Sequence, residues 1–282
     1  MITGPERVLP AHLAERARAH AVSGGAVAPA RDASTIALLR DAVDGLEVYV
    51  LRRVVTMAFA SGMQVFPGGT VDQRDLEHET GWVGPGPSAW ARRFGVDEAR
   101  ARGLVLAAVR ETFEESGVLL AGPRPDRVVA ETGDAGWESD RLALIERSLS
   151  FGAMLERRAL VLRADLLRAW ARWVTPEFEP RRYDTAFFVA AVPSGQRTRA
   201  VGGEADRVAW VKPREVLAAL AAGDVLMLPP TAVVLREISE HETVDAVLGA
   251  ADDRTMSTIM PRPVLDGGPV RVVLPGEPGY DR

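Results

Sequence analysis

Three glutamates at helical spacing are the residues of this chain best suited to chemistry. Glu111, Glu114 and Glu115 stand in the segment RETFEESGV, residues 110–118. On an α-helix, positions i, i+3 and i+4 share one face, so the three carboxylates are expected to lie side by side. Oxygen ligands gathered in this way can hold a hard divalent cation, and the spacing therefore predicts a metal site on a helix.

The residues around these glutamates favour a helix that packs on a sheet. Val105 and Phe113 fall roughly opposite the glutamates, as in an amphipathic helix with a core-facing stripe. Gly117 follows the last turn, where glycine readily takes the left-handed conformation that ends a helix. The alternative is a solvated charged face, because like charges at i, i+4 cost only a few tenths of a kcal/mol and Arg110 can pair with Glu114.

Composition limits the classes of function. The chain has 282 residues, 47% of them hydrophobic, which is enough to bury a large core. Its formal net charge of -5 argues against a general nucleic-acid-binding surface, which needs a basic excess. Without cysteine, thiolate zinc sites, disulfides and a cysteine nucleophile are excluded. With no apolar run of membrane-spanning length and no signal pattern at its start, the chain is expected to be cytoplasmic, with no nucleic-acid or membrane partner.

Apolar runs separated by turn signals outline the elements around the acidic helix. Two such runs flank Asp44-Gly45 and predict a β-hairpin. Further strands are expected at residues 65–66, 170–174, 185–192, 208–211 and 270–274. Helices are expected at residues 88–94, from about 97 or 102 to 116, from 212 onward and within 229–251. Strands interleaved with a few helices predict an α+β sandwich with a mixed sheet, not a doubly wound parallel sheet.

The same signals suggest how the chain is organised. Residues 1–33 are rich in Ala, Arg, Gly and Pro and predict an irregular or partly helical lead-in. Residues 34–282 predict a single domain with two insertions, a Gly/Pro-rich surface loop at about 76–100 and a helical segment at about 137–169. The sequence leaves open whether the second insertion caps a cleft or forms a dimer contact.

The segment 110–118, taken with Gly69 upstream, resembles the Nudix box, Gly-x5-Glu-x7-Arg-Glu-U-x-Glu-Glu-x-Gly-U with U apolar. Members of the Nudix family hydrolyse phosphoanhydrides linked to a nucleoside diphosphate. The chain departs from the pattern in three places. Asp75 replaces the first glutamate, Thr112 takes a usually apolar position, and the spacer from Asp75 to Arg110 is about 27 residues longer.

These departures are shared with one branch, the peroxisomal acyl-coenzyme A diphosphatase-like Nudix group. The chain is similar to that branch at FPGG (66–69), WVTP (173–176) and RYDTAFF (182–188), as well as at the acidic helix. The resemblance runs from about residue 34 to beyond residue 210. It implies an α/β/α Nudix sandwich with a mixed sheet.

The resemblance also implies roles for the acidic helix and the glycine turn. Glu114 and Glu115 are expected to be the main ligands of Mg2+ or Mn2+, with the carbonyl of Gly68 completing the shell. Glu111 is the candidate to ligate a second metal or to take the proton of the attacking water, and Arg110 is expected to orient a neighbouring carboxylate. A divalent metal would neutralise the phosphate oxygens and acidify the water that attacks in line.

A later acidic residue usually joins such sites from a loop across the cleft. Glu204 fits that position best, six residues before Trp210, and Asp206 is the fallback. The alternative for Glu204 is an ordinary carboxylate on a surface loop.

The residues assigned to substrate by resemblance are Arg53, Phe66, Gly69, Arg182 and Asp184. Coenzyme A-cleaving members carry an Arg-Ser, a second Arg and a Gly before FPGG. Arg53 and Gly62 fit this signature, whereas Val54 and Ala58 occupy the other two positions. A salt bridge at a strand end is the alternative for Arg53, and pairing of Arg182 with Asp184 is the alternative for those two.

The sequence therefore predicts a Nudix diphosphatase that takes a small-molecule nucleotide conjugate. Coenzyme A or acyl-coenzyme A is the expected substrate, and coenzyme A would yield adenosine 3',5'-bisphosphate and a phosphopantetheine. The alternatives are NADH, ADP-ribose or a dinucleoside polyphosphate as substrate, or a non-catalytic Nudix-fold module that only binds its ligand. The sequence leaves open whether the chain forms a homodimer.

Overall fold

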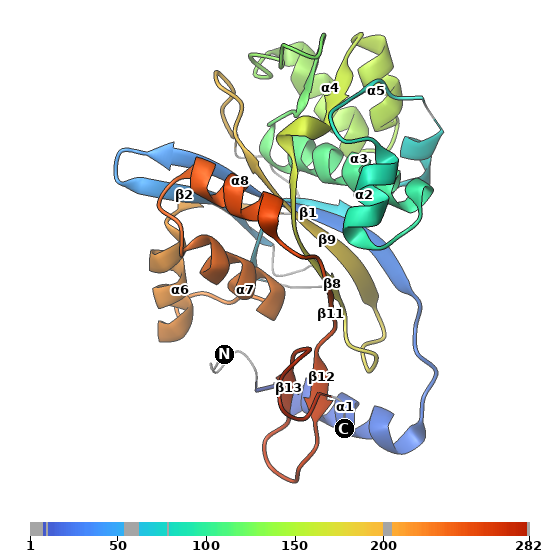
Figure 1. The fold of residues 1–282 in the computed structure, drawn as a ribbon, viewed down its shortest axis with the longest axis vertical. Coiled ribbons are helices and arrows are strands. Elements are labelled where there is room, and N and C mark those ends of the chain that lie inside the picture. The colour runs from blue at the N-terminus through green and yellow to red at the C-terminus, as the bar shows by residue number, and fades with distance from the viewer. Residues whose placement is uncertain (1–7, 10, 54–61, 78, 200–204, 281–282) are drawn as a thin grey trace.

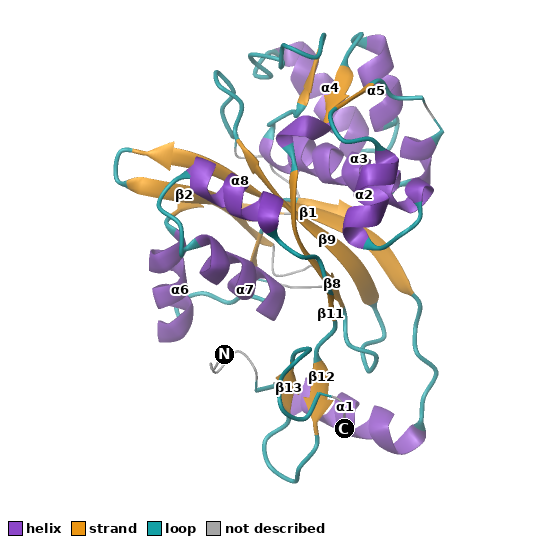
Figure 2. Cartoon of the chain, in the orientation of Figure 1, coloured by secondary structure: helices purple, strands orange, loops and turns teal. Residues whose placement is uncertain are grey.

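A mixed β-sheet forms the centre of the molecule (Figures 1 and 2). The computed structural model describes residues 8–9, 11–53, 62–77, 79–199 and 205–280. Within these residues the main sheet runs β10-β2-β1-β9-β8-β11, and the short strands β3 and β4 pair with β2 and β1. The bounds are β1 Ala30–Ala42, β2 Gly45–Arg53, β3 Gln64–Val65, β4 Gly68–Thr70, β8 Arg168–Val174, β9 Arg182–Ala191, β10 Ala205–Val211 and β11 Thr258–Ile259.

The strand directions make the sheet mixed. Strands β1 and β2 form the expected antiparallel hairpin, in which Ala42 pairs with Gly45, and the φ of Gly45 is 113°, a value that glycine adopts without strain. Strand β1 also pairs in parallel with β9, from Ala30 opposite Arg182 to Leu39 opposite Ala191. The α+β class with a mixed sheet, expected from the sequence, is confirmed.

Helices cover both faces of this sheet, which explains why β1 is apolar on successive residues and not on alternate ones. On one face, Ile36 and Leu38 pack in a core with helices α2 (Pro87–Phe94) and α3 (Glu98–Ser116). On the other, Ala37 and Leu39 pack in a second core. Helices α6 (Pro213–Ala222), α7 (Pro229–Ile238) and α8 (Val244–Asp253) contribute to this second core.

Helix α3 has clear start and stop signals. The side chain of Asp97 caps its first turn by accepting a hydrogen bond from the backbone N–H of Arg100 at 2.8 Å. Gly117 ends the helix at φ 76°, and its N–H donates to the carbonyl of Phe113. The acidic helix is therefore confirmed, with the earlier of its two expected starts.

The two expected insertions contribute to the core on the α3 side of the sheet and contain more strand than the sequence suggested. Residues 76–100 hold the end of the 3-10 turn η2 (Gln73–Leu76), strand β5 (Trp82–Val83), α2 and the start of α3. Residues 137–169 hold most of α4 (Ala135–Ile145) and α5 (Phe151–Arg157), as expected, but then β7 (Val161–Arg163), the 3-10 turn η3 (Ala164–Leu166) and the start of β8. Strand β7 lies between β5 and β6 (Ala121–Gly122), and these pairings override the helical pattern of its residues.

The chain ends pack against each other away from the main sheet (Figure 1). Helix α1 (Ala11–Ser23) buries Ala14 and Ala17 in a small core with Phe178 and Val270. Strands β12 (Arg262–Val264) and β13 (Arg271–Val273) form a separate hairpin there. The division into residues 1–33 and 34–282 remains a proposal. Among the described residues, no helix has both the length and the apolarity needed to cross a bilayer.

Candidate active site

The glycine turn of FPGG lies in close contact with strand β1 on one side and helix α3 on the other. A Cβ atom on Gly68 would lie 2.4 Å from the carbonyl oxygen of Ser34, and a Cβ on Gly69 would lie 2.2 Å from Oε1 of Glu111. Both distances are far below ordinary contact. Close approach of the backbone of β1 therefore requires glycine at position 68, and Gly69 leaves room for the carboxylate of Glu111.

Glu115 is fixed against the same turn. Its Oε2 accepts a hydrogen bond from the backbone N–H of Gly68 at 2.8 Å. Tyr49 on strand β2 has a raised pKa, mainly because it is buried and also because the negative charge of Glu115 is near. Its phenol therefore stays protonated at neutral pH. Strand β4 and the last turn of α3 are thus joined through a predicted metal ligand.

Arg110 connects the acidic residues of this region. Its Nε donates to Asp75 at 2.8 Å, its Nη1 lies 2.9 Å from both Glu111 and Glu114, and its Nη2 donates to the carbonyl of Thr70. Burial by itself lowers the pKa of Arg110, but the charges of the three carboxylates outweigh burial and raise it. The guanidinium is therefore always charged and holds two of the three glutamates in place.

Asp75, which stands where the Nudix box has a glutamate, completes this network. Its side chain is 1% exposed and, besides the bond from Arg110, accepts one from the backbone N–H of Phe151 at 3.3 Å. The 3-10 turn η2, which carries Asp75, packs on α3, so the shorter side chain still reaches the arginine. The Phe151 bond ties the second insertion to the acidic helix.

The carboxyl end of α3 is held by residues that the sequence did not single out. Arg141, which is 3% exposed, donates through Nη1 to the carbonyl of Glu114 at 2.9 Å. The hydroxyl of Thr132 donates to the carbonyl of Gly117 at 2.6 Å, and the backbone N–H of Arg199 donates to Ser116. These donors satisfy carbonyls that a helix end leaves open. No spacing in the sequence marks them, because each comes from a distant segment.

The donors of this site are chemically suited to a hard cation, since three carboxylates stand within one turn of helix beside Gly68. The described residues contain no group of three acidic or histidine side chains already placed to hold a metal ion. In the contacts that the structure shows, Glu111 and Glu114 each lie against Arg110 through Oε1, and Glu115 accepts from the N–H of Gly68 through Oε2.

The other expected ligands and substrate contacts are only partly visible. Glu204, Val54 and Ala58 lie outside the described residues, and so does the side chain of Asp206. Arg53 and Gly62 do lie together: the N–H of Gly62 donates to the carbonyl of Arg53 at 3.0 Å. Phe66 is 3% exposed and packs in the core on the α6–α8 face of the sheet.

Arg182 and Asp184 are engaged elsewhere in the fold. Arg182 donates to the carbonyls of Thr175 and Ala28, and it is not paired with Asp184 in the contacts of the described residues. Asp184 accepts from Arg172 and Arg100, both at 2.6 Å. Since Arg100 precedes Glu111 by 11 residues on α3, Asp184 lies roughly 16 Å along the helix from the glutamates. The structure thus does not bring these two residues to the acidic turn.

Both the fold and the sequence of this chain are similar to those of known proteins. The fold is similar to the crystal structure of a Nudix hydrolase from Alicyclobacillus acidocaldarius, with a TM-score of 0.67, 27% identity, and 79% of this chain and 97% of that chain covered. The sequence model of the family described as the NUDT19 Nudix domain matches residues 96–238, just over half of the chain. The chain therefore belongs to the Nudix hydrolase superfamily, in its NUDT19-like branch.

Two curated relatives show the extent of the similarity. The putative Nudix hydrolase 7 of Caenorhabditis elegans is 28% identical over 203 residues, which are 70% of this chain and 57% of the relative. The acyl-coenzyme A diphosphatase NUDT19 of Gallus gallus is 26% identical over 252 residues, 74% of this chain and 65% of the relative. The chain thus spans less than two thirds of the length of either relative. The family resemblance expected from the sequence is confirmed.

Proposed function

We propose that this protein hydrolyses a phosphoanhydride bond in a nucleoside diphosphate conjugate, with coenzyme A or acyl-coenzyme A as the preferred substrate class. Coenzyme A would be cleaved to adenosine 3',5'-bisphosphate and a phosphopantetheine. The observation that carries the proposal is the turn of α3 with three glutamates: Arg110 contacts Glu111 and Glu114, while Glu111 and Glu115 lie against the Gly68-Gly69 turn. The names of the curated relatives support the choice of substrate.

We assign the following tasks to the residues of this turn. Glu114 and Glu115, with the carbonyl of Gly68, would hold Mg2+ or Mn2+, and Glu204 is retained as a further ligand. Glu111 is the candidate to ligate a second ion or to accept a proton from water, because its carboxylate lies against Gly69 in close reach of the turn. Bound divalent metal supplies charge neutralisation at the phosphate oxygens and lowers the pKa of water.

Arg110 acts through the glutamates in this proposal. It contacts Glu111 and Glu114 with one nitrogen and is itself held by Asp75 and the carbonyl of Thr70. An arginine fixed on two sides orients the carboxylates that it contacts, since its planar group presents donors in fixed directions. We therefore class Arg110 as a positioning residue.

The main alternative of another class is a Nudix-fold module that binds a nucleotide conjugate without cleaving it. The complete set of Glu111, Glu114 and Glu115 favours the enzyme, because a binding module has no need to keep three negative charges beside a phosphate. Cleavage of NADH, ADP-ribose or a dinucleoside polyphosphate is the alternative within the enzyme class.

The test is hydrolysis of a substrate panel by the purified full chain, with products separated by ion-pair chromatography. The panel holds coenzyme A, an acyl-coenzyme A, NADH, ADP-ribose and a dinucleoside polyphosphate, each with Mg2+ or Mn2+. Coenzyme A or its acyl ester should give the highest kcat/KM. Binding of a panel member without cleavage under any of these conditions would favour the module instead.

Glu115→Gln tests the residue assignment. It should lower kcat by roughly 10²-fold or more, because a neutral amide is a much poorer ligand for a hard cation. Glu98→Gln is the matched control, since Glu98 lies exposed in the first turn of the same helix and should keep the parent rate. A folded Glu115→Gln variant with the parent rate at saturating Mg2+ would show that the assignment is wrong.

A further inference from the structure

The hydroxyl of Ser34 on strand β1 is buried and lacks a hydrogen-bond partner. Ser34 is 1% exposed, and its Oγ atom has no donor or acceptor in contact among the described residues. The next hydroxyl along the strand is engaged, because Thr35 donates to the carbonyl of Pro67 at 2.6 Å. A buried polar atom without a partner costs stability, whereas alanine would fill the same position with no such atom. Folding alone therefore does not explain a serine at position 34.

Strand pairing places Ser34 beside the glycine turn of the candidate active site. Ser34 lies directly opposite Gly69 in the antiparallel pair of β1 with β4. Residues that are directly opposite in such a pair point to the same face, with Cβ atoms about 5 Å apart. Gly69 has no side chain, and Oε1 of Glu111 lies 2.2 Å from the place that its Cβ would take. The hydroxyl of Ser34 and the carboxylate of Glu111 are therefore neighbours on one face of the sheet.

The alternation of β1 identifies this face as the face of the acidic helix. Ile36 and Leu38 follow Ser34 at intervals of two residues, so they point to the same side of the strand. Both pack in the core that contains α3. On β9, Ala186 is the parallel partner of Ser34 and belongs to the same core. The partner of the hydroxyl must therefore come from the α3 side of the sheet.

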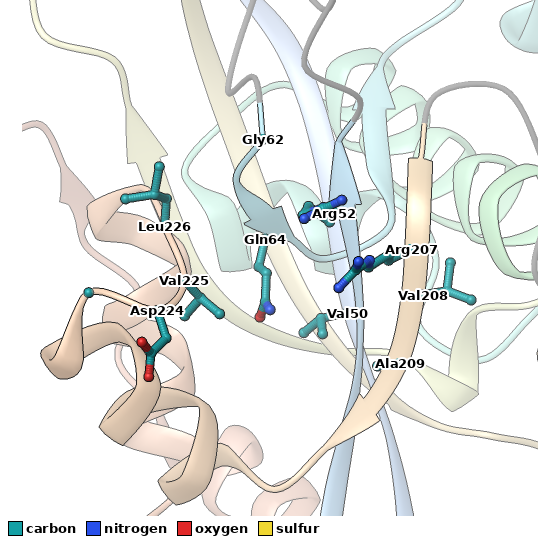
Figure 3. A pocket seen from close by; sticks show the side chains of 11 residues that line it. Val50, Arg52, Gly62, Gln64, Arg207, Val208, Ala209, Asp224, Val225 and Leu226 are labelled. Carbon is teal, nitrogen blue, oxygen red and sulfur yellow. The ribbon is translucent and has the colours of Figure 1, made fainter.

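A groove on the opposite face does not supply that partner. Figure 3 shows this groove, which has a volume of about 750 Å³ and is lined by Val50, Gln64 and Leu226 among others. Val50 packs in the second core, with helices α6, α7 and α8. A ligand held in the groove would thus be separated from Ser34 by the sheet itself.

The carboxylate of Glu111 can accept a further hydrogen bond while it keeps its contact with Arg110. A carboxylate has two oxygens with about four lone-pair sites, and Arg110 lies 2.9 Å from Oε1 of Glu111. Carboxylates that bind a metal ion are themselves held by hydrogen bonds from neighbouring groups, which fix their orientation. Ser34 offers a donor of this kind on the side of the strand that faces Glu111.

We propose that Ser34 is a positioning residue whose hydroxyl donates to the carboxylate of Glu111 when the site holds its divalent cation. The assignment rests on the proposed function, in which Glu111 ligates a second ion or accepts a proton from water. A change of side-chain rotamer is enough to bring the two groups together, because they already share one face of the pair. Ser34 acts through Glu111 and touches no reacting atom.

The first experiment compares three substitutions of Ser34 in steady-state hydrolysis of the best substrate of the panel. Ser34→Ala removes the donor and should lower kcat by about tenfold, the effect of losing one hydrogen bond to a charged group, with KM changed by less than about twofold. Ser34→Cys keeps the volume but is a weak donor, so it should resemble Ser34→Ala. Ser34→Thr keeps the hydroxyl and should recover most of the parent kcat.

Urea unfolding of the same variants without metal separates this role from a structural one. The midpoint for Ser34→Ala should equal or exceed that of the parent, because an unpartnered buried hydroxyl is removed. Thr35→Val is the matched control on the same strand, and its midpoint should fall, because the carbonyl of Pro67 loses its donor. The parent kcat in Ser34→Ala overturns the proposal. A loss of kcat that Ser34→Cys restores also overturns it, since the volume of the side chain would then matter and not its hydroxyl.

The second experiment needs no turnover. Urea unfolding at saturating Mn2+ is measured for Ser34→Ala, Glu111→Ala and the double variant. If the hydroxyl donates to Glu111 in the loaded site, the effects of the two substitutions on the unfolding equilibrium constant should depart from additivity by about threefold or more. With EDTA in place of Mn2+, the effects should add within about twofold. Additive effects in both conditions overturn the proposal.

Together the two experiments distinguish this assignment from the proposed function. A chain that cleaves no member of the panel but shows the coupling at Mn2+ would contradict the proposed function and keep Ser34 as the donor to Glu111. Cleavage of coenzyme A at the parent rate by Ser34→Ala, with additive effects at Mn2+, would keep the proposed function and reject the role of Ser34.

Discussion

Replacing Gly69 with alanine should lower the rate of hydrolysis and leave the free energy of unfolding almost unchanged. The added Cβ would lie 2.2 Å from Oε1 of Glu111 and 2.4 Å from its Cδ. Ordinary contacts between such atoms are about 3.5 Å, so the carboxylate has to move by more than about 1 Å. The clash is with the far end of a flexible side chain, and the φ of Gly69 is not positive, so the backbone accepts alanine.

The expected magnitudes follow from that displacement. A catalytic group misplaced by about 1 Å costs roughly 10²-fold in rate, and we expect this loss in kcat for Gly69→Ala with coenzyme A and Mg2+. The free energy of unfolding should change by less than about 1 kcal/mol, because only the Glu111 side chain is displaced. Steady-state hydrolysis and urea unfolding measure the two quantities.

Gly249→Ala is the matched control for this experiment. Gly249 lies within α8, and nothing is within 4 Å of its added Cβ. Alanine there should keep the parent kcat and raise stability by about 0.5–1 kcal/mol, since glycine is a poor helix former. A folded Gly69→Ala variant with the parent kcat would refute the reasoning that Gly69 makes room for a working Glu111.

Two further substitutions probe the frame of the site. Arg141→Met should lower the free energy of unfolding by about 2–4 kcal/mol, because the carbonyl of Glu114 loses a buried charge-assisted donor; a change below about 1 kcal/mol in urea unfolding would contradict this. Asp184→Asn should flatten the loss of stability in acid. Burial raises the pKa of Asp184, but Arg172 and Arg100 outweigh it and lower the pKa. The stabilising contribution of Asp184 is therefore present above about pH 4 and lost as pH falls through its lowered pKa. The free energy of unfolding, measured at pH 7, 5 and 3, should decline more steeply in the parent than in the variant.

The parts of the fold that depend on local signals could be predicted from the sequence. The cap at Asp97, the stop at Gly117 and the Asp44-Gly45 turn each act within a few residues, and the structure has the helix and the hairpin that they indicate. Strand β7 was missed because its pairing partners, β5 and β6, are distant in sequence. Sheet pairing of this kind overrides local preference.

The candidate site, too, could be predicted from the sequence only in part. The spacing of the glutamates predicts a shared face, and the structure gathers Glu111 and Glu114 at Arg110. The support of that turn by Arg141 and Thr132 could not be predicted, since hydrogen bonds to backbone carbonyls leave no pattern in side-chain types. Similarly, Asp184 was assigned to substrate by its position in a motif, while its two arginine partners come from α3 and β8.

The parallel pairing of β1 with β9 has a consequence for how the molecule is made. The two partners begin at Ala30 and Arg182, about 150 residues apart, and ten residue pairs join them at the centre of the sheet. On a ribosome that adds roughly 5–20 residues per second, the β1–β2 hairpin waits on the order of 10 s for its central neighbour. During that interval one edge of β1 is unpaired and apolar, a state prone to self-association. Nascent chains of this protein should therefore depend on chaperones until residue 191 has emerged.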